Sequence, residues 1–366
     1  MAGAYISVPF CAQKCSYCNF SSGVYPGALL EEYLAALKAE IDAQAGAWGD
    51  GPDTLYLGGG TPSLLDAPRL ERVLERLARA EWREATIEAA PGTVTTGRAA
   101  DWRRMGLDRV SLGVQSFVPG EIAAVGRRHS PQQVEAEARL LRQEGISKIN
   151  IDLIAGLPHQ TPESWRISLD WVERIEPPHV SVYMLEVDQD SRLGREIEAG
   201  GTRYGAGAAP PEDAVAGFYE EAVGRLERMG LRRYEISNFA RPGFESAHNL
   251  KYWRLEPYRG FGADAHSCDG LRRWWNVETA QEYVKRFQAG ESPVDGEEPA
   301  RPAEERFFVG LRLAAGIEPD PQEWDRFAAP IRRLTDGGLL DRDGARLRLT
   351  DRGVMLSNLV FQEFIR

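Results

Sequence analysis

Short apolar runs alternate with longer segments of helical periodicity through the first half of the chain. The runs predict strands at residues 4–8, 54–57, 85–88, 109–115, 148–154 and 179–185. The segments between them are long enough for helices, and within 28–45 the apolar residues Leu30, Leu34 and Leu37 recur at helical spacing. Strands joined in this way pair in parallel through right-handed crossovers. The pattern therefore predicts an α/β fold of six strand–helix units, as a barrel or an open sheet.

The pattern changes in the second half. Residues 199–211 are rich in Gly, Ala and Pro and predict a loop or hinge, followed by an amphipathic helix from 211 to about 229. We therefore expect a core domain of residues 1–230 and a C-terminal domain of residues 231–366.

The end of the chain predicts a mainly α-helical unit that resembles a winged helix. From about Pro302 the pattern predicts three helices, then a hairpin at Asp343-Gly344 and a terminal helix. Winged helices often bind DNA, but a formal net charge of −11 argues against binding to a phosphate backbone. We expect no nucleic-acid partner and favour a lid or docking module.

Composition sets further limits. The chain has 366 residues of which 43% are hydrophobic, enough for a substantial core. Its N-terminus shows no export signal, and no apolar run is long enough to span a bilayer. We expect a cytoplasmic protein, because free cysteines fit a reducing compartment. Peripheral membrane contact and a homodimer are both left open.

Three cysteines follow the first predicted strand. Cys11, Cys15 and Cys18 are separated by three and then two residues. Thiolates are the usual ligands of iron–sulfur clusters, and a loop of this spacing can ligate three irons of a [4Fe–4S] cluster. The fourth iron is then open to the amino and carboxylate groups of S-adenosylmethionine (SAM). That arrangement can generate a radical by reductive cleavage of the sulfonium.

Other interpretations of these thiols are weaker. A zinc site would need a fourth ligand such as His129 or His248, and inert buried thiols are a further alternative. Only one more cysteine, Cys268, is present, and no second Cys-x-x-Cys follows. A disulfide framework does not suit four cysteines in a chain of this size. We expect a cluster that does not use Cys268.

Polar residues and glycines lie at or just past the ends of five predicted strands: Cys11, Gly58 to Thr61, Glu88, Gln115 and Asp152. In barrels of parallel strands, chemistry collects at the carboxyl ends of the strands. The glycine loop lets a backbone approach a ligand closely, although a plain tight turn would use the same residues. We expect these residues to surround one site.

Five segments of the chain carry a family resemblance. They are Tyr5-Ile-Ser-Val-Pro-Phe-Cys11, Gly58-Gly-Gly-Thr-Pro-Ser63, Ile87-Glu-Ala-Ala-Pro-Gly92, Ser111-Leu-Gly-Val-Gln-Ser-Phe117 and Ile151-Asp-Leu-Ile-Ala-Gly-Leu-Pro158. They resemble the HemN/HemW branch of radical SAM proteins over nearly the whole chain. That branch contains oxygen-independent coproporphyrinogen III dehydrogenases of porphyrin biosynthesis and haem chaperones. The resemblance implies a partial (β/α)6 radical SAM barrel.

The resemblance also implies a role for each residue of the expected site. Tyr5 would flank the cluster. The methionyl amino group of SAM would be bound by Gly59, Gly60 and Thr61, and its carboxylate by Arg127. Glu88 and Gln115 would bind the ribose region, and Asp152 the ribose or adenosine side. A guanidinium is well suited to a carboxylate, although an exposed helix arginine is the default interpretation of Arg127 without the family.

Two features distinguish the dehydrogenases of this branch from the haem chaperones. The dehydrogenases usually carry a long extension before the first strand and a fourth cysteine two residues after the third. Here the first strand begins at about Ala4, and position 20 is Phe20. Both features are similar to the haem chaperones, as is His248-Asn-Leu-Lys-Tyr-Trp253, which matches their HNxxYW motif.

The resemblance therefore implies a haem chaperone that delivers haem to respiratory proteins. His248 or Tyr252 would be the axial haem ligand, with a core histidine as the alternative. Because the motif and the SAM residues lie in different halves of the chain, we expect the two sites to be separate. Dehydrogenase activity is not expected but is the alternative, and a radical SAM methyltransferase or cyclopropanase is the third function considered.

Overall fold

The computed structural model describes residues 2–44, 51–77 and 81–365. Its centre is a twelve-stranded sheet in which the six predicted strands follow one another in sequence order: β1 (Gly3–Val8), β2 (Thr54–Gly59), β3 (Glu84–Ala89), β4 (Arg109–Gln115), β5 (Lys148–Ala155) and β6 (His179–Met184). Each of these strands pairs in parallel with the next. The prediction of an α/β fold with successive parallel strands is confirmed.

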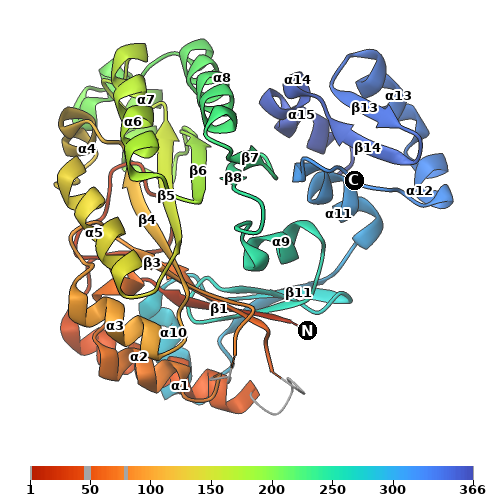
Figure 1. The fold of residues 1–366 in the computed structure, drawn as a ribbon. Coiled ribbons are helices and arrows are strands. Elements are labelled where there is room, and N and C mark those ends of the chain that lie inside the picture. The colour runs from red at the N-terminus through yellow and green to blue at the C-terminus, as the bar shows by residue number, and fades with distance from the viewer. Residues whose placement is uncertain (1, 45–50, 78–80, 366) are drawn as a thin grey trace.

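Helices between these strands cover one face of the sheet, which curves around its other face (Figure 1). They are α1 (Gly27–Gln44), α2 (Ala67–Leu74), α3 (Thr96–Arg104), α4 (Pro119–Ala124), α5 (Pro131–Gln143) and α6 (Pro162–Ile175). Side-chain caps fix where several of them begin. Ser130 accepts from the backbone N–H of Gln133, and Thr161 forms a capping box with Ser164. A proline follows each of these caps at the first helical position, where no N–H is needed.

Side chains alternate along the parallel strands between two environments, as pleating requires. The apolar set is buried against the helices and includes Leu55, Leu57, Ile87, Val110, Leu112, Ile149, Ile151, Val180 and Val182. The other set is polar and lines hollows on the concave side, and it includes Tyr56, Glu84, Glu88, Ser111, Lys148, Asp152 and Tyr183. The interior of the curved sheet is therefore polar from one end of the strands to the other.

The sheet continues beyond these six strands. On one side β7 (Arg232–Arg233) and β8 (Asn238–Ala240) extend it past β6, and on the other β9 (Tyr258–Phe261) pairs in parallel with β1. The strands β10 (His266–Cys268), β11 (Arg272–Asn276) and β12 (Val294–Pro299) complete it, and within the described residues its edges are β12 and β7. The boundary predicted near residue 230 does not interrupt the sheet. Cys268, which we expected in a separate domain, belongs to the same sheet as β1.

The remaining helices of the first 300 residues are α7 (Arg192–Glu198), α8 (Glu212–Arg228), α9 (Ala247–Trp253) and α10 (Ala280–Gln288). The segment predicted as a loop holds only 3-10 turns at Arg203–Ala208, in which Tyr204 and Gly205 have positive φ angles. Of these helices, α9 lies between the sheet and the C-terminal elements (Figure 1).

The C-terminal unit follows the predicted order. It contains α11 (Pro302–Phe308), α12 (Pro321–Arg326), α13 (Ala328–Asp336), the hairpin β13 (Leu340–Asp343) and β14 (Arg346–Leu349), then α14 (Asp351–Met355) and α15 (Ser357–Gln362). Gly344 turns the hairpin with a φ of 60°, which glycine adopts at little cost. Phe307 packs on Phe327 and Phe364 with ring centroids 4.5 and 4.6 Å away, so the unit has its own aromatic centre.

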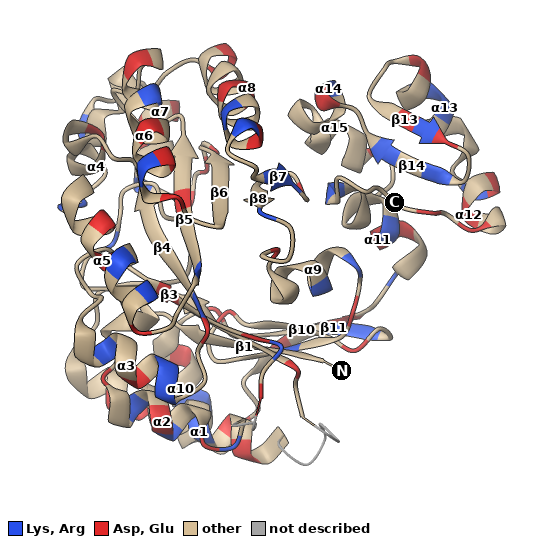
Figure 2. Cartoon of the chain, viewed as in Figure 1, with Lys and Arg blue, Asp and Glu red and all other residues tan. Residues whose placement is uncertain are grey.

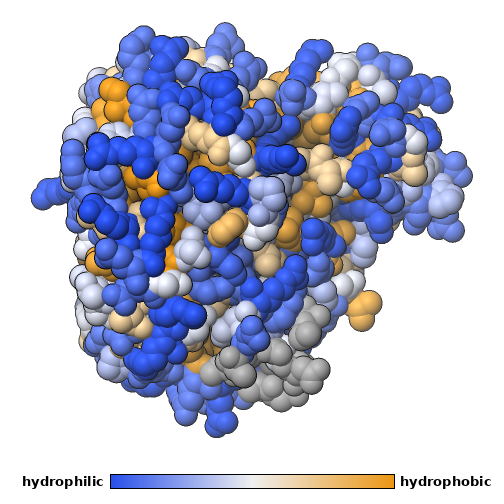
Figure 3. All heavy atoms as spheres, viewed as in Figure 1, coloured by the Kyte–Doolittle hydropathy of each residue, from blue (hydrophilic) through white to orange (hydrophobic). Residues whose placement is uncertain are grey.

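The surface is mainly hydrophilic on the face shown in Figure 3, with apolar residues scattered between charged ones. In the part of the chain that the structure describes, none of the helices combines the length and apolar character needed to cross a bilayer.

Candidate cofactor site

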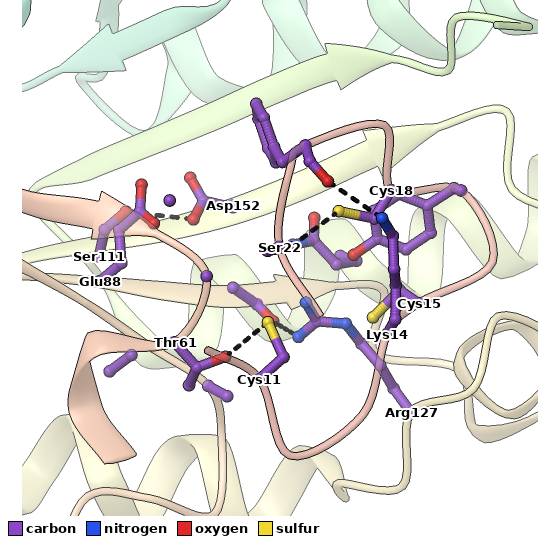
Figure 4. A pocket seen from close by; sticks show the side chains of 18 of the residues that line it. Cys11, Lys14, Cys15, Cys18, Ser22, Thr61, Glu88, Ser111, Arg127 and Asp152 are labelled. Atoms are coloured by element: carbon purple, nitrogen blue, oxygen red, sulfur yellow. Dashed lines mark hydrogen bonds between the residues drawn. The ribbon is translucent and has the colours of Figure 1, made fainter. Parts of the chain in front are cut away.

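A pocket of about 330 Å³ opens at the carboxyl ends of the parallel strands, and the loop after β1 carries the three cysteines along its wall (Figure 4). All three are free and partly exposed. Cys11 accepts a hydrogen bond from the Thr61 hydroxyl at 3.5 Å, and the Cys18 sulfur lies 3.8 Å from the Ser22 hydroxyl. Burial raises the pKa of the Cys11 thiol, against the opposing effect of these hydroxyls. The structure thus brings the predicted thiols together with the glycine loop.

The thiol arrangement bears on the choice between a cluster and a single ion. Among the described residues, no three His, Cys, Asp or Glu side chains converge closely enough to hold one metal ion. Zinc needs its donors around one atom, whereas each thiolate of a [4Fe–4S] cluster binds a different iron. Neither His129 nor His248 lines this pocket. A zinc site at these thiols would therefore lack the histidine considered as its fourth ligand.

The glycine loop at the end of β2 packs against the chain that leads into the cysteines. A Cβ on Gly60 would lie 2.6 Å from the Val8 carbonyl oxygen and 2.8 Å from the Phe10 nitrogen. Thr61 donates its backbone N–H to the Phe10 carbonyl at 2.9 Å. A side chain at position 60 would therefore be directed against this backbone. Gly60 is needed for this close approach, and it is not a plain turn residue.

Gln115 and Arg127 bring unused hydrogen-bonding capacity to the pocket. The register of β4 against β5 shifts just before Gln115, whose φ of 69° is unusual for a residue other than glycine. The Gln115 Oε1 and Arg127 Nε atoms are buried, and neither has a hydrogen-bond partner among the described residues. Buried polar groups are normally paired, so atoms of this kind in a pocket fit a polar ligand.

The guanidinium of Arg127 is held beside the cysteine loop. It donates from Nη1 to the Gly113 carbonyl at 2.5 Å. Burial alone would lower its pKa, but Tyr17 and Cys15 beside it raise the pKa, so the cation is retained. Figure 4 shows Arg127 on the cysteine side of the pocket and Glu88, Ser111 and Asp152 grouped on the other side. An amino acid bound on the cysteine side would therefore face a cation. A nucleoside bound on the other side would face two carboxyl groups.

The two carboxyl groups of the pocket differ in their partners. Glu88 accepts from the Tyr56 hydroxyl at 2.9 Å. Asp152 accepts from Ser111 at 3.1 Å and from the Asn150 amide at 2.7 Å. Burial raises the pKa of both groups, and with Asp152 nearby the pKa of Glu88 rises to about 7. Near neutral pH, Glu88 therefore exchanges between its charged and neutral forms.

This shift predicts a pH-dependent stability. Glu88 binds its proton more tightly in the folded than in the unfolded chain, so the free energy of unfolding should fall as the pH rises from about 4.5 to about 7. Its contribution is roughly 3 kcal/mol, because the pKa rises from 4.5 to about 7 on folding. Glu88→Gln keeps a neutral partner for Tyr56 and should remove that contribution. Urea unfolding at pH 5 and pH 8 measures it as the difference between the two proteins, and an equal pH effect in both would contradict the assignment.

Arg127 supplies the second prediction. Arg127→Ala should leave the methionyl carboxylate of SAM without a charge-assisted partner, a bond worth roughly 1.5–3 kcal/mol. The affinity for SAM should fall about 10- to 150-fold in calorimetric titration of cluster-loaded protein. Arg128→Ala is the matched control, because Arg128 is the next residue, is exposed and does not line the pocket. Equal affinities in the two variants would remove Arg127 from the SAM site.

The other predicted residues lie deeper. Tyr5 does not line the pocket but stacks on Tyr56 with ring centroids 6.1 Å apart.

His248 is 1% exposed. Its Nδ1 atom lies 3.0 Å from Thr54 Oγ1, and its Nε2 atom lies 2.7 Å from the Tyr252 hydroxyl. Burial lowers the pKa of His248 to about 3, so its ring is neutral. Haem ligation by His248 stays a prediction, and it would require the loss of one of these contacts.

The HNxxYW motif is not remote from the pocket, contrary to our expectation from the sequence. The Tyr56 ring lies 5.3 Å from the His248 ring, and the Tyr56 hydroxyl donates to Glu88. A second set of buried hydrogen bonds joins Asp152 through Asn150 and His179 to Tyr234. Both sets cross the polar interior, because inward-facing residues of neighbouring strands meet there.

Several lining residues were missed by reasoning from the sequence. They include Phe20, Tyr56, Ser111, Gly113 and Tyr183. Tyr56, Ser111 and Tyr183 occupy alternate positions of their strands, on the same face as the predicted residues. A search for polar residues at every second strand position would have found them. Phe20 was noted in the sequence only as a feature shared with the haem chaperones, and the structure places it, 64% exposed, at the wall of the pocket.

Comparison with known proteins agrees with this geometry. Residues 5–172 match the Radical SAM superfamily, and residues 298–356 match the HemN C-terminal domain. Heme chaperone HemW of Mycobacterium tuberculosis is 36% identical over 383 residues, covering 99% of this chain and 94% of the relative. Heme chaperone HemW of Bacillus subtilis is 32% identical over 385 residues, covering 100% of this chain and 99% of the relative.

A solved structure supports the fold. Coproporphyrinogen III oxidase HemN of Escherichia coli superimposes with a TM-score of 0.85 at 23% identity, covering 99% of this chain and 89% of that one. The second domain match begins at residue 298, close to the start predicted at Pro302 for the C-terminal unit. From its full-length similarity to the curated chaperones, the chain belongs to the HemW family of radical SAM proteins.

Proposed function

We propose that the chain is a haem chaperone that holds a [4Fe–4S] cluster and SAM, binds haem and delivers it to respiratory haem proteins. The observation that carries the cofactor part is the pocket, where three free thiols meet a glycine loop and two unpaired buried polar atoms. The relatives named heme chaperone HemW support the haem part.

Each pocket residue has a proposed task. Cys11, Cys15 and Cys18 would ligate three irons, the Gly59 to Thr61 loop would receive the methionyl amino group, and Arg127 would pair with the carboxylate. Gln115 would hydrogen-bond the ribose with its unpaired Oε1 atom. On the far side, Glu88 and Asp152 would accept from ribose hydroxyl groups. When bound next to a reduced cluster, SAM can supply a 5′-deoxyadenosyl radical.

One residue favours the chaperone over the dehydrogenase. In the resemblance described above, the dehydrogenases carry a fourth cysteine two residues after the third, where this chain has Phe20. The Phe20 side chain is 64% exposed and lies against the pocket, so the loop presents an apolar surface in place of a thiol. The reducing cytoplasm is the proposed site of action, since the thiols are free and a cluster is sensitive to oxygen.

Haem retention tests the proposal. The full chain would be reconstituted anaerobically with iron and sulfide, incubated with haem and passed through a gel-filtration column. We expect the haem absorbance to elute with the protein together with about one cluster per chain. Elution of haem-free protein that carries a complete cluster would contradict the haem part, whereas haem retention without a cluster would contradict the cofactor part.

A further inference from the structure

A second hollow lies at the opposite end of the parallel strands from the cysteines. It encloses about 830 Å³, which is within the usual range for small-molecule sites. Arg83 and Glu84 at the start of β3 and Lys148 at the start of β5 form its floor. Its walls are formed by Arg233, Tyr234, Gly243, Glu245, Ala247, Leu250, Arg254 and residues 313–316. We refer to this hollow as the basal cleft, and it joins the sheet, α9 and the segment before α12.

The basal cleft is positively charged in a protein whose net charge is −11. Its basic residues are Arg83, Lys148, Arg233 and Arg254. Figure 2 shows basic residues on β7 and α9, which border it. Two acidic residues also line the cleft, and both are engaged in holding the chain. Glu84 accepts from Ser246 and from the backbone of residues 247 and 248, and Glu245 accepts from the Gly243 backbone.

The arginines of the basal cleft are weakly neutralised. Arg233 pairs with Asp351 at 3.0 Å, but Asp351 is 99% exposed, and such surface pairs contribute little. The Arg254 side chain is exposed, and within the described part of the chain its guanidinium has neither an ion-pair nor a hydrogen-bond partner. The Lys148 ammonium group lies 2.5 Å from the Asp108 carboxylate. The Arg83 guanidinium lies 3.9 Å from the Asp53 carboxylate. Arg254 is therefore available to an anionic ligand, and Arg233 can pair with one by giving up its exposed partner Asp351.

Two faces of helix α9 point in different directions inside the curved sheet. One lies toward the cofactor pocket and the other toward the basal cleft. His248 and Tyr252, four residues apart, contact each other and the aromatic residues under the SAM pocket. Leu250 and Arg254, the residue that follows the last turn of α9, line the basal cleft. Residues at this spacing share a helix face, so the two pairs face in different directions. Glu84 fixes the start of α9 through three hydrogen bonds, and the helix is thereby set against the cleft.

We infer that the basal cleft binds the propionate end of haem, with Arg254 and Arg233 pairing with the two carboxylates. The inference rests on the proposed function and names the site at which it acts. A guanidinium matches a carboxylate in a two-bond fork, and two arginines on different walls suit two carboxylates on one ligand. Leu250 and Leu313 supply apolar surface for the edge of the macrocycle. In this arrangement His248 and Tyr252 contact the opposite side of α9 and do not touch the ligand, so the inference is an alternative to the axial ligation predicted from the sequence.

The test is an anaerobic haem titration of the full, cluster-loaded chain. Arg254→Glu should weaken haem binding at least about 10-fold, because a charge-assisted contact is replaced by a repulsive one. The double variant Arg233→Glu, Arg254→Glu should bind still more weakly, and Arg254→Lys should retain part of the affinity. Arg332→Glu is the matched control, an exposed arginine of α13 outside the cleft, and should bind as the wild type does.

A second probe separates propionate recognition from loss of structure. Haem dimethyl ester has no free carboxylate, so it should bind the wild-type chain at least about 10-fold more weakly than haem, and Arg254→Glu should not weaken it further. If Arg254→Glu binds haem as tightly as Arg332→Glu, or if the ester binds like haem, the basal cleft is not the propionate site. Those outcomes leave the proposed function standing. Failure of the wild-type chain to bind haem would overturn both.

Discussion

Replacement of Cys11, Cys15 or Cys18 by serine should abolish stable assembly of the cluster. Each thiolate would ligate a separate iron, so the loss of one leaves one iron without a protein or SAM ligand. The effect should be complete, because a serine hydroxyl is a poor substitute for a thiolate in a soft-ligand site. Iron and sulfide analysis after anaerobic reconstitution measures it, together with the visible absorbance of the cluster.

Cys268→Ser is the matched control for this experiment. Cys268 is buried in β10 and does not line the pocket, so its replacement should leave iron and sulfide content unchanged. A complete cluster in the triple serine variant would remove the assignment of all three ligands. Loss of the cluster in Cys268→Ser alone would show that the fourth cysteine takes part.

Gly60→Ala should damage the cofactor site by displacing the backbone that forms it. The added Cβ would meet the Val8 carbonyl and the Phe10 backbone at less than 3 Å. Either β1 or the glycine loop must then move, and overpacking of this kind costs about 1–3 kcal/mol. Because Phe10 precedes Cys11 and hydrogen-bonds Thr61, the movement should displace both a cluster ligand and the SAM loop. Lower thermal stability, lower iron content and loss of SAM binding are expected together.

Gly97→Ala is the control for this substitution. Gly97 lies in the first turn of α3, and a Cβ there would have nothing within 4 Å. Alanine should stabilise the helix by roughly 0.5–1 kcal/mol and leave cluster content unchanged. Normal iron content and SAM affinity in Gly60→Ala would show that the loop tolerates the shift. The close packing of the two loops would then have no part in forming the site.

Much of the fold could be predicted from the periodicity of the sequence. The six parallel strands and the helices between them follow from local patterns, because a buried parallel strand is a short apolar run and a covering helix shows an apolar stripe. The extension of the sheet by β9 to β12 could not be predicted in this way. The pairing of β9 with β1 joins residues more than 250 positions apart, and nothing local in Tyr258–Phe261 specifies its partner.

The candidate site was predicted in part. Residues at strand ends, such as Glu88 and Gln115, were identified because carboxyl ends of parallel strands share one edge. Tyr56 was not identified, since it lies inside a strand and its importance depends on neighbours from other segments. The link from Tyr56 to His248 was likewise hidden, because the two residues are far apart in sequence and meet only inside the curved sheet. The basal cleft draws on four distant segments and shows no local pattern.

We propose that the chain carries haem and does not transform a porphyrinogen. The most direct measurement supplies the cluster-loaded chain with SAM, a reductant and coproporphyrinogen III, and follows carbon dioxide release, with HemN of Escherichia coli as the positive control. We predict no release above background from a sample that retains added haem. SAM-dependent carbon dioxide release at a rate comparable to that of HemN would contradict the claim and assign the chain to the dehydrogenases.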